Sequence, residues 1–104
     1  MQLFLKGKRT NINALAEYNV RSGKFTVLKG SHVSHEVSTS TKFRGVKTVL
    51  SLRSQYVKDG ITTQNVIFQS PSTAANFVTG TSTNGLAVWK NGKGDRLGTI
   101  LKKP

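Results

Sequence analysis

The stretch that decides the fold is residues 14–30, which read ALAEYNVRSGKFTVLKG. In its first half, every second residue falls on one side of the chain, and these are Ala14, Ala16, Tyr18 and Val20. A period of two is typical of a β-strand with one buried face. Gly23 then lies in a short polar segment and can adopt the positive φ of a tight turn. The pattern predicts an antiparallel hairpin whose second strand begins near Phe25 and buries Phe25 and Val27.

The longest helix is predicted over residues 43–59, where the hydrophobic period changes to that of an α-helix. Its apolar side is formed by Val46, Val49, Leu50, Tyr56 and Val57. Gly60 is expected to end the helix in a left-handed conformation. Arg53 falls within the apolar arc, and we expect its charge to pair with Glu36 or Asp59, or to reach a ligand. The preceding residues 31–42 are rich in Ser and Thr and predict a loop.

The second half of the chain contains a strong helix start at Ser70-Pro71. Serine is a preferred N-cap, and proline is well tolerated at the first helical position. This shorter helix should end at Gly80, and residues 61–70 before it resemble a strand. The residues LAVWK (86–90) predict a last strand, because Asn-Gly turn dipeptides lie on both sides of it. Residues 96–104 predict a short helix or an edge strand, and residues 2–6 a weaker first strand.

Together these elements predict an α+β fold in a single domain over residues 1–104. A small, mostly antiparallel sheet should be covered on one face by one longer and one shorter helix. The chain has no cysteine, which excludes disulfides and thiolate metal sites and fits a reducing compartment. No apolar run approaches the length of a membrane helix. We therefore expect a soluble cytoplasmic protein without a membrane partner.

Charge is the strongest global signal. Sixteen Lys and Arg residues face four Asp and Glu residues, giving a formal net charge of +12. The cations are spread along the whole chain, which indicates a folded basic surface rather than a basic tail. Such an imbalance costs stability through self-repulsion and is typical of proteins that bind a polyanion, most often nucleic acid. An acidic protein surface is the alternative partner.

Two blocks of sequence carry a resemblance to a known family. They are GKFTVLKGS (residues 23–31) and FQSPSTAANFVTGTSTNGLAVWKNGKG (residues 68–94). Together they resemble the Domain of Unknown Function 4357 family over about residues 13–101. That family's pattern runs from an FxVLKGS strand through an SPSxAA helix start to an NG dipeptide, W-K and a glycine turn. This chain has Leu86 where many members have an aromatic residue directly after the NG dipeptide.

The resemblance implies a function without catalysis. Domains of this family often lie at the C-terminal end of proteins with a GIY-YIG nuclease domain or within restriction-modification systems. The implied role is a DNA-binding accessory module whose partner is a nuclease or methylase subunit. Because this chain begins close to the start of the domain, we expect it to be free-standing, excised, or dependent on another polypeptide for any chemistry.

Catalytic and metal motifs give no competing prediction. His32 and His35 lie three residues apart, but the sequence shows no third ligand of the kind a zinc site needs. The four carboxylates, which nuclease chemistry would need clustered around Mg²⁺, lie far apart in the sequence. At the Ser70 helix start, an ordinary N-cap is favoured over a phosphate site. We expect no enzymatic activity, no metal and no cofactor.

The candidate nucleic-acid-binding residues fall into two basic groups and one aromatic residue. The groups are Arg44, Lys47 and Lys58 around the predicted long helix, and Lys90, Lys93 and Arg96 around the last turns. Trp89 lies beside the second group and has two interpretations, a core residue or a stacking platform for a base. The alternative function is a protein-binding adaptor or mobile-element inhibitor that contacts an acidic partner surface.

Overall fold

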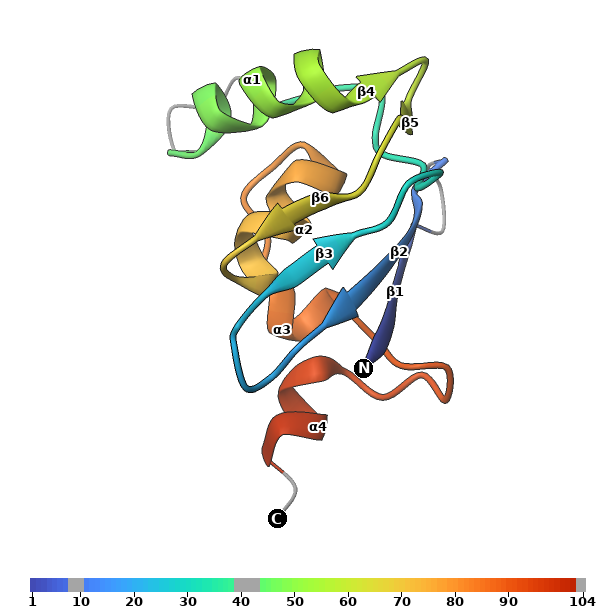
Figure 1. The fold of residues 1–104 in the computed structure, drawn as a ribbon, viewed down its shortest axis with the longest axis vertical. Helices are drawn as coiled ribbons and strands as arrows, with labels where there is room; N and C mark the ends of the chain where they lie inside the picture. The colour runs from blue at the N-terminus through green and yellow to red at the C-terminus, as the bar shows by residue number, and fades with distance from the viewer. Residues whose placement is uncertain (8–10, 39–43, 103–104) are drawn as a thin grey trace.

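The computed structural model describes residues 1–7, 11–38 and 44–102 and confirms the α+β class. Four antiparallel strands form the main sheet in the order β1-β2-β3-β6 (Figure 1). Their bounds are β1 Gln2–Lys6, β2 Asn13–Tyr18, β3 Phe25–Val27 and β6 Val66–Phe68. The weaker first strand is therefore real, and it pairs along its whole length with β2.

The predicted hairpin is confirmed in β2 and β3, where Ala16 lies opposite Val27. Strand β2 ends at Tyr18, and Val20, which the alternation placed on the buried side, is 51% exposed. The reason is the turn that follows β2. The side-chain oxygen of Asn19 accepts hydrogen bonds there from the backbone N–H groups of residues 21 and 22. Gly23 has the positive φ expected of it, 78°.

Helix α1 (Val46–Tyr56) confirms the long helix but is shorter than predicted. The predicted residue Phe43 lies outside the described residues. Val49 is buried, whereas the prediction for Leu50 was wrong, since it is 51% exposed. Gly60 does not end the helix. The chain passes directly into β4 (Val57–Lys58), turns at residues 59 and 60 with positive φ angles, and returns as β5 (Ile61–Thr62).

Helix α2 (Pro71–Thr79) begins and ends as predicted. The Ser70 hydroxyl accepts a hydrogen bond from the Thr73 amide at 3.1 Å. Gly80 has a φ of 75°, and a Cβ there would overlap the carbonyl oxygen of Glu36. Both requirements, a left-handed conformation and a close backbone approach, select glycine at this position.

The predicted last strand at residues 86–90 is wrong, because most of it is helix α3 (Gly85–Val88). The Asn84 side chain accepts a hydrogen bond from the Leu86 amide, so this asparagine is an N-cap and not a hairpin turn residue. A Cβ on Gly85 would overlap the backbone of Pro71, so the glycine lets α3 approach the start of α2. Helix α4 (Leu97–Lys102) follows, which resolves the open choice between helix and edge strand.

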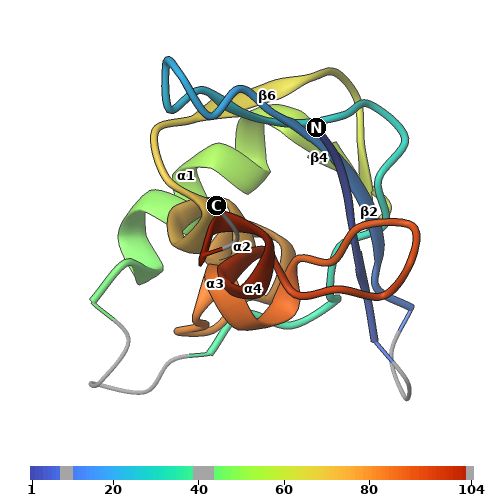
Figure 2. The same ribbon diagram turned by 90° about the horizontal axis from the view of Figure 1, so that it is seen from below.

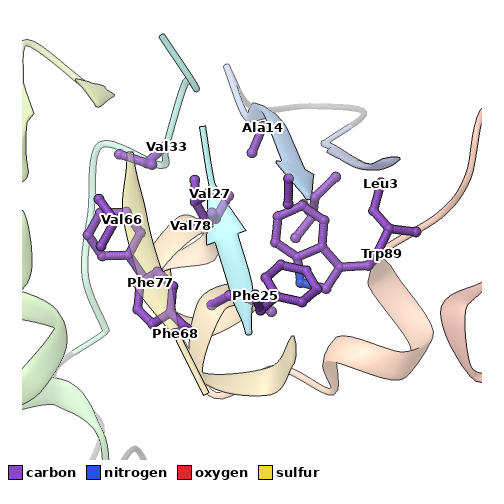
Figure 3. Close-up of a cluster of buried hydrophobic side chains, with 14 of the residues drawn as sticks. Leu3, Ala14, Phe25, Val27, Val33, Val66, Phe68, Phe77, Val78 and Trp89 are labelled. Carbon is purple, nitrogen blue, oxygen red and sulfur yellow. The ribbon is translucent and has the colours of Figure 1, made fainter. Parts of the chain in front are cut away.

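The core lies between the inner face of the sheet and α2 (Figure 3). Alternate strand residues point into it, such as Leu3 and Leu5 of β1, and Phe77 and Val78 of α2 face them. Figure 2 shows α2, α3 and α4 gathered on one side of the curved sheet. Within the described ranges no helix lies on the other side, so the outer face of the sheet is open. None of the helices in those ranges is long and apolar enough to cross a membrane.

Candidate nucleic-acid interface

The two predicted basic groups lie in different parts of the molecule. We call Arg44, Lys47 and Lys58 the helix group, and Lys90, Lys93 and Arg96 the loop group. All six side chains are exposed. The helix group lies just before α1, on α1 and on β4, at one end of the longest axis, whereas the loop group precedes α4 in the other half of the molecule (Figure 1). The structure therefore does not form one continuous site from all six cations.

Lys90 lies at the edge of the main sheet, beside β1. Its N–H donates to the Phe4 carbonyl at 2.9 Å, and the Phe4 N–H donates to the Lys90 carbonyl at 2.7 Å. Arg96 in turn pairs with Lys90 in an antiparallel bridge. Residues that lie directly opposite each other in an antiparallel pair direct their side chains to the same face. Phe4, Lys90 and Arg96 therefore form a row on the outer face of the sheet.

The segment between Lys90 and Arg96 is held by one side chain, that of Asn91. Its amide oxygen accepts hydrogen bonds from the backbone N–H groups of Lys93 at 3.0 Å and Asp95 at 2.9 Å. The Asn91 amide nitrogen donates to the Asp95 carboxylate at 3.3 Å. Backbone hydrogen bonds also join Asn91 to Gly94 and Asp95. Because the loop is ordered by these bonds, Lys93 is presented from a fixed backbone.

Two further residues border this loop and were missed as site residues by sequence reasoning. The side chains of Phe4 and Lys6 lie on the outer face of β1, because those of Leu3 and Leu5 lie on the inner face. The Lys6 ammonium lies 5.8 Å from the centroid of the Phe4 ring. The alternation of residues 2–6 could have revealed them, but the strand pattern is short. The pairing of β1 with Lys90 leaves no trace in the local sequence.

Phe4 and Lys6 form one wall of a groove whose other wall is the loop. The groove has a volume of about 400 Å³ and is lined by Phe4, Lys6, Val88, Lys90, Asn91, Gly92 and Gly94. Arg96 borders a separate groove between α3 and α4. Among the described residues the structure records one ion pair, between the Met1 amino group and Glu17. No carboxylate of a described residue therefore lies within ion-pair distance of the cations around the loop.

Trp89 is a core residue, and its assignment as a base-stacking residue is wrong. Its side chain is 0% exposed, and its ring centroid lies 4.9 Å from that of Phe25 (Figure 3). The indole N–H donates to the Pro71 carbonyl at 3.0 Å. A buried indole with a satisfied N–H stabilises the fold and offers no face to a ligand. The aromatic side chain that borders the loop on the outside is Phe4 instead.

The hydroxyls at the start of α2 are used within the protein. The Ser70 hydroxyl caps the helix, and the Ser72 hydroxyl accepts a hydrogen bond from the Gly85 amide at 3.0 Å. This favours the N-cap interpretation over a phosphate site. His32 and His35 are exposed, and His35 contacts the Asn11 amide at 3.1 Å. Within residues 1–7, 11–38 and 44–102, no group of three or more His, Asp or Glu side chains could hold a metal ion.

Arg53 contacts backbone carbonyls and not the carboxylates predicted for it. Its guanidinium donates to the carbonyls of Ser34 at 2.6 Å, Phe77 at 2.8 Å and Val78 at 3.1 Å. Phe77 and Val78 lie in the last turn of α2, where carbonyls have no partner within the helix. Burial lowers the pKa of the Arg53 guanidinium from its ordinary value, although arginine stays charged in proteins. Arg53 therefore joins α1 to the end of α2 and is not part of an exposed basic surface.

Comparison with known proteins identifies the family. No curated protein and no solved structure matches the chain. A family model described as Domain of unknown function (DUF4357) matches residues 3–101. The match begins earlier than the motifs at residues 23–31 and 68–94 and so includes β1, with Phe4 and Lys6. It covers nearly the whole chain, and the protein therefore belongs to the family described as Domain of unknown function (DUF4357).

Proposed function

We propose that this protein is a non-catalytic nucleic-acid-binding module, with DNA as its partner, and that the loop group and Lys6 form the binding surface. The observation that supports this most is the row of Phe4, Lys90 and Arg96 on the open face of the sheet, next to Lys6 and Lys93. Lys6 and Lys90 line a groove there, and Lys93 lies in the hydrogen-bonded loop that forms its other wall. Phosphate contacts supply most of the affinity of such surfaces and fix the register of the nucleic acid.

The proposal predicts how binding depends on salt. Each phosphate that a Lys or Arg neutralises releases condensed counterions, so affinity falls with salt concentration. Four cations correspond to a slope of log affinity against log salt of about −3 to −4. The rest of the net charge of +12 adds long-range attraction, which raises the association rate at low salt.

The test compares two variants that remove the same charge from different places. Changing Lys90, Lys93 and Arg96 to Gln should reduce the affinity for a DNA duplex or single strand. The slope of log affinity against log salt should become shallower, at about −1. Changing Arg44, Lys47 and Lys58 to Gln is the matched control, because it removes equal charge from exposed positions. The control should keep the slope of the unaltered protein, and both should keep its melting temperature. Equal losses in both variants would show that net charge alone, and not this surface, binds nucleic acid.

The accessory role is the finer part of the proposal. We place the module in the cytoplasm, next to a nuclease or methylase subunit of a restriction-modification system, to which it would supply affinity for DNA. A pull-down after nuclease treatment separates this from the adaptor function. A partner retained only when nucleic acid is intact favours DNA binding. A partner that stays bound without nucleic acid, through the same three cations, would favour an adaptor that grips an acidic protein surface.

A further inference from the structure

The groove beside β1 combines one aromatic ring, that of Phe4, with two cations, Lys6 and Lys90. Phe4 is half-buried, and its side chain lies on the face of β1 away from the core. Lys6 lies beside it two residues further along β1, and Lys90 lies beside it on the neighbouring segment. The opposite wall includes Gly92 and Gly94, and a Cβ at either position would meet no atom within 4 Å. The loop side of the groove is therefore open backbone that a flat molecule can approach.

We propose that this groove takes one unpaired base of a single-stranded polynucleotide, stacked on the Phe4 ring, with the flanking phosphates on Lys6 and Lys90. The inference rests on the proposed function and adds the kind of nucleic acid that the site selects. Aromatic side chains in a positively charged groove are the means by which proteins bind single strands, because every base has a π-face. In a duplex those faces are covered by the neighbouring base pairs.

The Lys6 ammonium already occupies the position that a base would take. At 5.8 Å from the ring centroid it makes an exposed cation–π contact, which is weak. Its side chain is exposed and can swing aside while its charge moves to the adjacent phosphate. The backbone of Phe4 is held in place, because its N–H and its carbonyl both pair with Lys90 and because β1 as a whole pairs with β2. The ring is thus presented from an ordered strand.

The experiment measures binding of the full chain to three probes of equal length: oligo(dT), a strand of abasic nucleotides, and a duplex. The abasic strand keeps the phosphates and lacks the bases. We expect oligo(dT) to bind about tenfold more tightly than the abasic strand, the size expected for stacking of one base. Oligo(rU) should behave like oligo(dT), because stacking does not distinguish the sugars.

Phe4→Leu removes the ring and keeps an apolar side chain, and it should reduce the tenfold preference to about twofold or less while leaving the salt slope unchanged. Ile67→Ala is the control, because Ile67 is 53% exposed on β6, at the far edge of the same sheet. Phe4→Tyr keeps a ring and should retain the preference. It therefore tests the role of the ring even if the Phe4→Leu variant folds poorly.

The outcomes separate this inference from the function on which it rests. Equal, salt-dependent binding of oligo(dT), the abasic strand and the duplex would overturn the base site and leave nucleic-acid binding standing. Tighter binding of the duplex than of oligo(dT) would do the same. A preference that survives in a folded Phe4→Leu variant would place the base elsewhere and overturn the groove. If no probe binds at low salt, both proposals fail.

Discussion

Replacing Arg53 with Met should lower the free energy of unfolding by about 2–3 kcal/mol. Methionine keeps most of the apolar stem and removes the guanidinium, so the change isolates the hydrogen bonds. The Ser34 and Phe77 carbonyls lose the donors they have at 2.6 and 2.8 Å. The Val78 carbonyl keeps a second donor, the Ser34 amide at 2.9 Å. Two carbonyls left without this partner cost about 1–1.5 kcal/mol each, at the low end of the range because water can reach a half-buried site.

The assay is thermal and urea unfolding followed by circular dichroism. A loss of about 2–3 kcal/mol corresponds to a fall in melting temperature of roughly 8–24 °C for a domain of this size. Lys47→Met is the matched control, since it removes the same charge from an exposed position on the same helix. It should change stability by less than about 0.5 kcal/mol. Arg53→Lys should fall between the two, because an ammonium cannot reach several carbonyls in the way a planar guanidinium does.

The same variants distinguish a structural cation from a binding one. Arg53→Met should leave the salt slope for nucleic acid unchanged, because the guanidinium is already bound to carbonyls of the protein. If Arg53→Met were as stable as Lys47→Met, the carbonyl contacts would contribute nothing and the account of how α1 joins α2 would be wrong. If it also lost affinity for nucleic acid while remaining folded, Arg53 would belong to the binding surface.

Two further stability predictions follow from buried contacts. Trp89→Phe should lower the free energy of unfolding, measured in urea, by about 2 kcal/mol. The change removes the hydrogen bond to the Pro71 carbonyl and part of a fully buried ring. A loss below about 0.5 kcal/mol would mean that the indole N–H is dispensable. Gly80→Ala should cost at least about 3 kcal/mol, whereas Gly23→Ala should cost about 1 kcal/mol. Both glycines have positive φ, but only at Gly80 would a Cβ meet the backbone, so equal losses would contradict the close approach.

Local signals in the sequence predicted local structure well. The alternation in residues 14–18 specified β2, and Ser70 and Gly80 marked the two ends of α2, since caps act through neighbouring backbone groups. The segment at residues 86–90 was misassigned because a run of five residues carries too little periodicity to separate a strand from a helix. Asn84 is the N-cap of α3, but an Asn-Gly dipeptide is also typical of a hairpin turn, and the prediction followed the turn.

The candidate site was only partly predictable, for a different reason. Lys90, Lys93 and Arg96 were identifiable as a basic group because they are close in sequence. Phe4 joins them through a pairing between distant segments, which no local pattern encodes. The helix group was predicted as a separate set of nucleic-acid-binding residues, and the path of the chain places it around α1 and β4, away from the loop group. Distance in space between such groups depends on tertiary packing and not on residue type.

The most direct test of the central claim is a titration of isotope-labelled protein with oligo(dT), followed by amide chemical shifts in two-dimensional NMR. Our account predicts that the largest shifts fall on β1 and on residues 90–96. It also predicts that the affinity obtained from these shifts falls as the salt concentration is raised. Amides of α1 should change little. Shifts confined to α1 and β4, or no shifts at low salt, would contradict the claim that the sheet edge beside Lys90 binds nucleic acid.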